Sequence, residues 1–352
     1  MTFDIIGDIA IIKMNTPGDP LELAKKILEK HKHVKTVLLQ VSKVDIPFRV
    51  PKYKYLLGEK KTETIHKEFG LRFKVDVTKC YYSPRLENER MRIAKQVKEN
   101  EEVLVMFSGV NPYPIYIAKF AKPKIVYSIE INPFAVKYGL ENEKLNKVDD
   151  KIKTILGDVR DAVPLLGFLD DKDGVVFTEE WYLKDVLESG LKLNKLVLKI
   201  TNPDLLDLAF EIPSKEKYLL VKKDIRLTDL GEYIYKADGI IKETENSYMI
   251  VDKNKNVSEV KKFEKKFDRI VMPLPKEADT FLDVAIPVIK NNGIIHLYQF
   301  LREEEIDKKP KDILDYYSKK LGFKYKILNV VKCGDIAPRT YRVCIDFQVY
   351  KG

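Results

Sequence analysis

Apolar, β-branched runs alternate with amphipathic stretches along most of this chain. Residues 3–14 and 36–41 are apolar runs that flank a helical pattern from Leu21 to Glu29. This order predicts a small α/β domain of about one hundred residues. The pattern changes near Arg92, where we place the end of that domain.

Strand, loop and helix patterns follow one another in strict succession from Glu102 onward. Such a succession is typical of a parallel, doubly wound sheet. The predicted strands are Val103–Phe107, Ile125–Ile131, Ile152–Leu156, Arg269–Met272 and Ile294–Phe300. The predicted helices between them include Pro133–Leu145 and Ala278–Lys290. At the end of the chain, Tyr325–Lys332 and Tyr341–Tyr350 flank the loop Cys333–Thr340 and predict a hairpin.

About one hundred residues between Asp161 and Phe267 exceed what this alternation needs, because βα connections usually take ~2 to 6 residues. This segment has strand patterns of its own, at Lys195–Ile200, Tyr218–Val221 and Ser247–Asp252. We therefore predict an inserted, folded module. The lysine-rich stretch 253–266 that follows reads as a solvated linker, with RNA contact as the less favoured alternative.

Composition narrows the class of protein. With 45% hydrophobic residues the chain is globular, and 63 Lys+Arg against 54 Asp+Glu leave a net charge of +9. That excess suits a polyanionic partner without requiring one. The three cysteines have no CxxC spacing, and no apolar run approaches the ~20 residues of a membrane span. We expect a cytoplasmic protein with no metal and no membrane partner, and the sequence does not indicate its oligomeric state.

The segment Cys80–Ile93 combines a Ser-Pro turn with three arginines and two carboxylates. Cations in such a segment can hold a phosphate or a polarised carbonyl, and a carboxylate among them can stay ionised and accept a proton. The two carboxylates are Glu87 and Glu89. A glutamate in the first turn of the following helix is also favourable without any catalysis.

Three loops at the carboxyl ends of the first predicted strands form a candidate cofactor crevice. The first contains Gly109, where a ligand can approach the backbone. The second places Glu130 at a strand end, where a carboxylate can accept hydrogen bonds from two ribose hydroxyls. The third brings Asp158 toward an adenine amino group. Each residue also has a structural alternative: a turn glycine, a strand-end carboxylate and a helix cap.

Several ordered motifs carry a resemblance to a known family. They are Phe3-Asp-Ile-Ile-Gly-Asp-Ile-Ala-Ile, Phe48-Arg49-Val50, Thr64-Ile-His-Lys67, Tyr82-Ser-Pro-Arg-Leu-Glu-Asn-Glu-Arg90, Ile129-Glu-Ile-Asn-Pro133, Gly157-Asp-Val-Arg160, Leu274-Pro-Lys276, Gly293-Ile-Ile-His296 and Ala337-Pro-Arg339. Their order resembles that of the archaeal and eukaryotic tRNA (guanine-37-N1) methyltransferases and the related wyosine-pathway transferases. The match covers most of the chain outside the insertion.

The resemblance implies an α/β fold of class I methyltransferases, with S-adenosylmethionine as cofactor and tRNA as partner. Residues 1–92 would form the N-terminal α/β domain, 93–161 and 267–352 the Rossmann-like domain, and 162–266 the inserted module. The tRNA-elbow domain of many relatives is expected to be absent, because the chain begins where their second domain would.

The resemblance also implies roles for individual residues. Arg49 would stabilise negative charge on guanine O6, and Glu89 would take the N1 proton. The implied cofactor-binding residues are Phe107, Gly109, Asn111, Tyr113, Glu130, Ile131, Asp158, Val159 and Pro273. The implied substrate-binding residues are Tyr82, Arg85, Pro275 and Arg339. The target base would leave its stack to reach this pocket.

This sequence departs from the family pattern at four positions. The family has an acid where Val105 stands, a glycine where Asn111 stands, and asparagines where Phe69 and Pro273 stand. These changes keep two alternatives open beside methyl transfer. One is aminocarboxypropyl transfer to a wyosine precursor from the same cofactor, and the other is a catalytically inactive tRNA-binding homologue.

Overall fold

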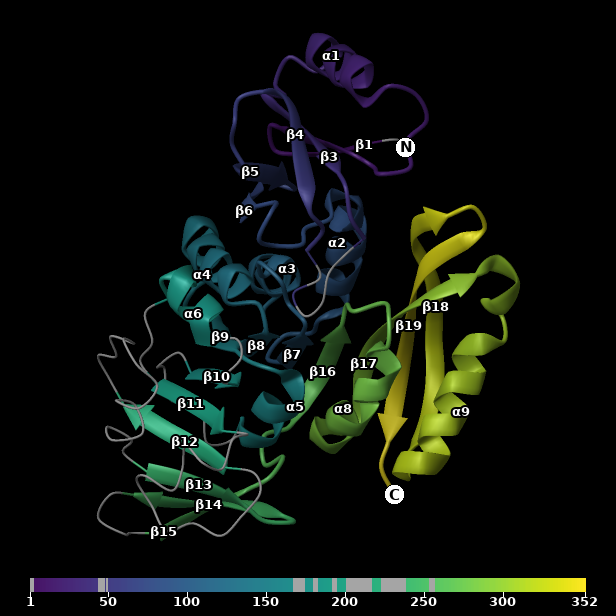
Figure 1. Ribbon diagram of the computed structural model, residues 1–352. Helices are drawn as coiled ribbons and strands as arrows, with labels where there is room; N and C mark the ends of the chain where they lie inside the picture. Colours follow the sequence, from purple (N-terminus) through teal and green to yellow (C-terminus); the bar gives the residue numbers. More distant parts are fainter. Residues whose placement is uncertain are drawn as a thin grey trace.

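The computed structural model (Figure 1) shows a small N-terminal sheet, a two-stranded hairpin and a large sheet, with helices packed beside the sheets. It describes residues 3–43, 48, 50–166, 175–179, 183–191, 195–200, 217–222, 239–252 and 257–352. No helix within these ranges has the length and apolar character needed to cross a membrane.

The N-terminal unit is a four-stranded sheet in the order β1-β2-β3-β4, with β1 Phe3–Ile6, β2 Ile9–Ile12, β3 Thr36–Gln40 and β4 Tyr53–Gly58. Helix α1 (Pro20–Lys30) covers it and buries Ala24 and Ile27 against the sheet. The predicted apolar run 3–14 is divided into two strands at Gly7, whose φ is +57°. A side chain at Gly7 would place its Cβ 2.1 Å from Thr64 Oγ1, so only glycine fits this turn.

A separate hairpin, β5 (Glu63–Glu68) and β6 (Leu71–Asp76), follows that sheet. The outer edge of β6 is paired by a helix instead of a strand. Asn142 on α4 (Pro133–Asn146) accepts from the backbone N of Lys74 at 2.7 Å and donates to the Lys74 carbonyl at 3.0 Å. Asn146, one turn later, makes the same pair of bonds with Arg72, at 3.0 and 2.7 Å. Two asparagines four residues apart therefore cover an edge strand that would otherwise expose its polar backbone.

The large sheet has the strand order β9-β8-β7-β16-β17-β19-β18 at its centre and far edge. Its strands are β7 Glu102–Met106, β8 Ile125–Glu130, β9 Ile152–Leu156, β16 Phe267–Met272, β17 Ile289–Arg302, β18 Lys324–Ala337 and β19 Thr340–Tyr350. The pairs from β9 to β17 are parallel, and β19 runs antiparallel to both its neighbours. The α/β fold class predicted from the sequence is confirmed.

The described strands of the segment 162–266 continue this sheet beyond β9. They are β10 Val175–Glu179, β11 Lys195–Ile200, β12 Lys217–Lys222, β13 Gly239–Glu243, β14 Ser247–Asp252 and β15 Val257–Lys261. The prediction of a solvated linker over the lysine-rich stretch is wrong. Part of that stretch is β15, and the Nζ of Lys265 donates to Glu102 at 3.0 Å.

Two further boundaries differ from prediction. The loop expected at Cys333–Thr340 is mostly strand, because β18 continues to Ala337 and only Pro338 and Arg339 form the turn. The helix expected over Ala278–Lys290 is a 3₁₀ turn, Ala278–Phe281, followed by α8, Leu282–Val288, and β17 begins at once. Apolar residues fill 282–289, so periodicity alone does not separate helix from buried strand there, whereas the end of β18 is mostly exposed and gives no apolar pattern.

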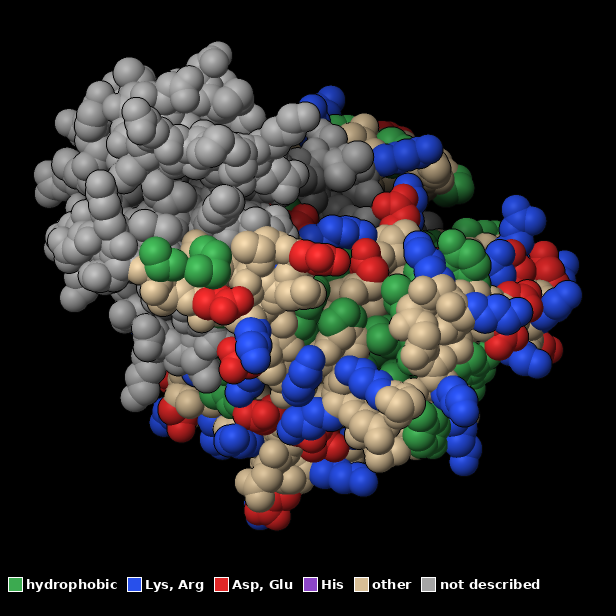
Figure 2. Space-filling model, turned by 90° about the horizontal axis from the view of Figure 1, so that it is seen from below, with side chains coloured by type: hydrophobic (Ala, Val, Ile, Leu, Met, Phe, Trp, Pro, Cys, Tyr) green, Lys and Arg blue, Asp and Glu red, His purple; other side chains and the backbone are tan. Residues whose placement is uncertain are grey.

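The surface seen from below, which faces away from the N-terminal sheet, mixes the two signs of charge. Figure 2 shows lysines and arginines interspersed with acidic side chains over its described part. The net charge of +9 therefore does not produce a uniformly basic field on that face.

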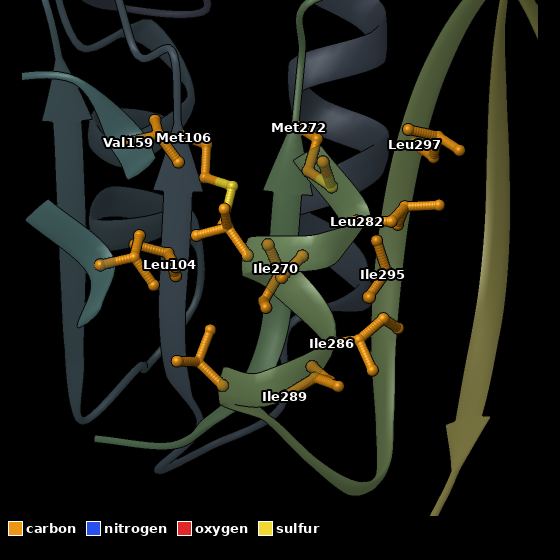
Figure 3. Close-up of a cluster of buried hydrophobic side chains, with 14 of the residues drawn as sticks. Leu104, Met106, Val159, Ile270, Met272, Leu282, Ile286, Ile289, Ile295 and Leu297 are labelled. Atoms are coloured by element: carbon orange, nitrogen blue, oxygen red, sulfur yellow. The ribbon is translucent and has the colours of Figure 1, made fainter. Parts of the chain in front are cut away.

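The main core lies between the sheet and α8. Figure 3 shows Leu104 and Met106 of β7 beside Ile270 of β16, with Leu282 and Ile286 of α8 packed over them. All five residues of β7 are buried, as expected of a parallel strand covered on both faces. Burying one such side chain contributes roughly 1.5–3 kcal/mol, so this layer holds the strand ends of the site in place.

Candidate active site

The loop after β7 is shaped by three residues with positive φ, at Phe107 (+55°), Gly109 (+58°) and Asn111 (+64°). The Glu130 carboxylate at the end of β8 fixes this loop. Its Oε2 accepts from the backbone N of Gly109 at 2.7 Å, and its Oε1 accepts from the backbone N of Asn132 at 2.9 Å. Glu130 thus ties the glycine loop to the start of α4. A Cβ added at Gly109 would meet the Tyr81 carbonyl oxygen at 3.8 Å, an ordinary van der Waals contact.

Asn111 does not line this crevice as predicted. Its side chain is fully buried in the opposite direction, where Oδ1 accepts from Ser128 at 2.6 Å and Nδ2 donates to Glu143 and Thr154 at 2.6 and 2.8 Å. An asparagine replaces the family glycine here because it tolerates positive φ and because these buried groups satisfy its amide. Its bulk therefore does not fill the crevice.

The loop after β9 completes the crevice. Asp158 caps the short helix α5 (Val159–Ala162) by accepting from the backbone N of Arg160 at 2.7 Å. The Arg160 guanidinium stacks 3.7 Å from the ring of Phe281, and Phe107 meets the same ring edge-on at 4.8 Å. The loops after β7 and β9 thereby meet the 3₁₀ turn that follows β16. Val159 is buried in the core, and Ile131 and Pro273 are half-buried at the strand ends.

Glu89 lies on α2 (Glu87–Gln96) with only 5% of its surface exposed. Its carboxylate is held by three donors: Arg92 Nε at 2.7 Å, a second Arg92 nitrogen at 2.8 Å, and the Tyr298 hydroxyl at 2.6 Å. Tyr298 in turn accepts from the Tyr113 hydroxyl at 3.1 Å. Tyr113, predicted to bind cofactor, is therefore buried on the Glu89 side of the site. Burial raises the pKa of both tyrosines well above the ordinary value.

A chain of buried polar groups continues from Arg92 into the sheet. Arg92 contacts Asp346 of β19, Asp346 contacts His296 Nδ1 at 2.6 Å, and His296 Nε2 contacts Arg269 at 2.8 Å. Burial alone would raise the pKa of Asp346, but the hydrogen bonds and charges of His296 and Arg92 outweigh it and lower that pKa. Burial lowers the pKa of His296.

Cys344 joins His296 and Asp346 in a group whose ligand-type atoms lie within 4.8 Å of one another. The Cys344 thiol already donates to Asp346 at 3.2 Å, and two guanidinium groups flank the cluster. Positive neighbours and satisfied hydrogen bonds make this arrangement an internal polar network and not a cation site.

Tyr82 and Arg90 belong to a second buried network. The Tyr82 hydroxyl and an Arg90 nitrogen each lie 2.6 Å from Glu68 Oε1, and the Arg90 guanidinium stacks 4.9 Å from the Tyr82 ring. This ion pair is fully buried and joins α2 to β5. Arg90, one of the three arginines of the segment Cys80–Ile93, therefore has a structural role in this ion pair.

A cavity of about 250 Å³ lies between the N-terminal sheet, the segment 80–86 and the terminal hairpin. Its lining includes two of the predicted substrate residues, Tyr82 and Arg85, and Arg85 is paired with Asp4 across it at 2.7 Å. Arg49 lies outside the described residues, although Pro51 lines this cavity. Arg339 is exposed at the hairpin tip, 3.5 Å from Glu303, and does not line the cavity.

The lining also includes residues that the sequence did not single out. Tyr81 and Arg342 are joined by a hydrogen bond of 3.3 Å. Pro275, predicted at the pocket floor, accepts from the backbone N of Phe300 at 3.1 Å, beside Arg342 on the paired strand. The sequence contains one signal for the buried polar network, because His296 and Asp346 are isolated polar residues within apolar strands. Such residues must be paired when they are buried.

Comparison with known proteins gives matches over most of the chain. Residues 64–194 and 213–328 match the family described as TRM5/TYW2 methyltransferase domain, and residues 1–62 match TYW2 N-terminal domain. A relative from Nanoarchaeum equitans, "tRNA (guanine(37)-N(1))/4-demethylwyosine(37)-methyltransferase Taw22", is 38% identical over 99% of this chain and 100% of its own length.

Two other comparisons complete this picture. The crystal structure of Trm5b from Pyrococcus abyssi superposes with a TM-score of 0.64 at 32% identity, covering 99% of this chain and 74% of that one. A "tRNA(Phe) (4-demethylwyosine(37)-C(7)) aminocarboxypropyltransferase" from Methanocaldococcus jannaschii is 28% identical over 97% of this chain and 95% of its own length.

Proposed function

We propose that this chain, which belongs to the TRM5/TYW2 methyltransferase family, transfers a methyl group to guanosine 37 of tRNA at N1, or to a wyosine precursor at that position. The observation that carries this proposal is that the candidate cofactor site and a second cavity lie next to each other. A cofactor crevice at the ends of β7, β8 and β9 adjoins, through Tyr81 and Gly109, a cavity on the other side of the segment 80–86.

The cofactor is S-adenosylmethionine, which supplies an electrophilic methyl group on a sulfonium. The crevice fits it in two respects. The Glu130 carboxylate accepts from the backbone N of Gly109 and of Asn132, and a carboxylate at the end of this strand is a group that ribose hydroxyls can bind. Gly109 has no side chain, so a ligand can approach its backbone beside the Tyr81 carbonyl oxygen. We assign Glu130, Gly109 and Asp158 to cofactor binding, with Phe107 beside them.

Glu89 is the proposed acceptor of the N1 proton. Its three donors hold the carboxylate in one orientation. A positioned carboxylate of this kind can accept a proton from a base placed within hydrogen-bond reach. Removal of that proton leaves N1 nucleophilic toward the methyl group. Arg49 is the proposed electrostatic partner of guanine O6.

Aminocarboxypropyl transfer from the same cofactor is the second candidate. The relative that carries this name matches nearly the whole chain, and Pro273 replaces the asparagine of the guanine methyltransferases. An inactive homologue is less favoured, because the crevice retains its acidic residues and Asn111 does not obstruct it.

The deciding experiment uses S-adenosylmethionine carrying ³H in the methyl group and ¹⁴C in the carboxyl group, with three tRNAs that have guanosine, the tricyclic wyosine precursor or, as a control, adenosine at position 37. Methyl transfer places only ³H in guanosine-37 tRNA, and aminocarboxypropyl transfer places only ¹⁴C in tRNA that carries the tricyclic precursor. If neither label enters any of these RNAs while calorimetry shows no cofactor binding at millimolar concentration, the enzyme proposal fails.

A further inference from the structure

Arg342 is a buried cation that no acidic side chain neutralises in the described part of the chain. It lies on β19 with 7% of its surface exposed, and it lines the cavity described above. Its contacts are neutral groups: the Tyr81 hydroxyl at 3.3 Å and the face of the Phe300 ring at 5.6 Å. Its Nε–H has no hydrogen-bond partner among the described residues.

Among the described residues, no other charged group of the cavity forms an ion pair with Arg342. Asp4 is bound by Lys13 at 2.8 Å and by Arg85. Asp335 of β18 also lines the cavity but forms no ion pair with Arg342. A buried charge without a counter-charge costs several kcal/mol, and such a cation is stabilised by an anion that enters beside it.

The cavity belongs to the substrate side of the site. None of the crevice residues Phe107, Gly109, Glu130 or Asp158 lines it, whereas three tyrosines do, namely Tyr53, Tyr81 and Tyr82. Aromatic walls of this kind stack on an extruded base. Arg342 is also connected to the proposed base through its own strand, because β19 carries Asp346 as well, and Asp346 contacts Arg92, which holds Glu89.

We propose that Arg342 binds an anionic oxygen of the target nucleotide and thereby positions that nucleotide for transfer. This inference rests on the proposed function. Two sources of the oxygen share this chemistry: the phosphodiester beside nucleotide 37, and the base oxygen that becomes negative as N1 loses its proton. Arg342 and Tyr81 also interact electrostatically. Burial alone would raise the pKa of Tyr81, but the charge and the hydrogen bond of Arg342 outweigh it and lower that pKa.

The test compares wild type, Arg342→Gln, Arg342→Lys and a control, Lys326→Gln. Lys326 is an exposed residue on the same hairpin, so its variant loses the same charge outside the cavity. Each protein is assayed for tRNA affinity at several salt concentrations, for single-turnover methyl transfer at saturating tRNA, and for S-adenosylmethionine affinity.

A phosphate contact predicts that Arg342→Gln binds tRNA about ten- to hundredfold more weakly, with the salt slope reduced by about 0.7–0.9 and partial rescue by Arg342→Lys. A base-oxygen contact predicts unchanged tRNA affinity with a single-turnover rate at least about tenfold lower. Either result supports the proposal. Behaviour equal to that of Lys326→Gln in both assays overturns it, as does a loss confined to S-adenosylmethionine affinity.

A purely structural role is separated by thermal unfolding. The rise in Tm caused by saturating tRNA is measured for each variant against its own RNA-free Tm, so a general loss of stability cancels. A smaller rise for Arg342→Gln than for the control is expected for a phosphate contact, and an equal rise with a slower single turnover is expected for a base-oxygen contact; an equal rise with an unchanged rate contradicts the proposal. If wild type itself transfers no label to tRNA, the proposed function has failed, and if wild type is active while Arg342→Gln matches the control, only this inference has failed.

Discussion

At the scale of single residues, the site is built from polar groups whose burial is compensated within the protein. Glu89 is the clearest case, because a carboxylate that is only 5% exposed requires the donors that Arg92 and Tyr298 supply. The same bonds restrict its rotamers, so one arrangement satisfies the buried carboxylate and also the orientation that the proposed base needs. Asp346 and His296 then hold Arg92 from the other side.

The variant Glu89→Gln tests the proposed base. We expect the methyl-transfer rate to fall by about 10²–10⁴-fold, because the amide accepts no proton, while S-adenosylmethionine affinity stays within a few fold. Glu87→Gln, in the first turn of the same helix, is the control and should keep near-wild-type rates. Equal rates for the two variants would remove Glu89 from the mechanism.

Asn111 combines a left-handed backbone with a buried amide, and substitutions separate the two contributions. Asn111→Ala should lower the free energy of unfolding by about 2–4 kcal/mol, since it loses three hydrogen bonds and strains the backbone. Asn111→Gly loses the same bonds but adopts positive φ readily, so it should be about 1 kcal/mol less destabilising. Urea denaturation measures both, and an alanine variant as stable as the glycine variant would argue against backbone strain.

At the scale of helices and strands, the contact between α4 and β6 joins the two halves of the site. Asn142 and Asn146 bind the outward-facing backbone groups of β6, while β6 belongs to the hairpin that carries Glu68, the partner of Arg90. The orientation of this hairpin relative to the Rossmann-like sheet therefore depends on side-chain to backbone bonds as well as on apolar packing.

Hydrogen exchange should detect the loss of this contact. In the double variant Asn142→Ala, Asn146→Ala, exchange of the Arg72 and Lys74 amides should accelerate by at least about tenfold, because each loses its acceptor. The Phe73 amide lies between them and alternates toward β5, so it serves as an internal reference. Uniform acceleration across β6 would indicate unfolding of the hairpin instead.

Elements of this size were the most predictable from sequence. The pattern predicted β9, β11 and β14 with their observed bounds, because alternating and continuous apolar runs report local burial. It did not predict that β18 extends to Ala337, since that end of the strand is mostly exposed and polar. The pattern also did not indicate Arg342, because this residue contacts Tyr81 and lines a cavity formed by segments far apart in the sequence.

At the scale of the whole molecule, stability should depend on pH through Glu143. Burial raises the pKa of this carboxyl to about 7 from the ordinary value of 4.5. The folded protein therefore retains a proton that the unfolded chain releases. The stabilisation is complete below about pH 4.5 and is lost as pH rises through about 7.

We expect the contribution of this group to the free energy of unfolding to fall by about 3 kcal/mol between pH 4.5 and pH 8. Glu143→Gln should lack this component, because its amide carries no titrating proton and still offers an oxygen to Asn111 and Thr154. Chemical denaturation of both proteins at the two pH values provides the comparison. Parallel pH profiles for wild type and variant would contradict the assignment.

The cavity has walls from both ends of the chain, with Asp4 on β1 and Arg342 on β19. During synthesis, a ribosome-bound intermediate that has released the first three hundred or so residues still lacks its last wall. The loops after β7, β8 and β9, which are proposed to bind the cofactor, are synthesised well before that stage. Under the proposed function, a nascent chain therefore completes the walls of its tRNA-binding cavity only after β19 has been synthesised.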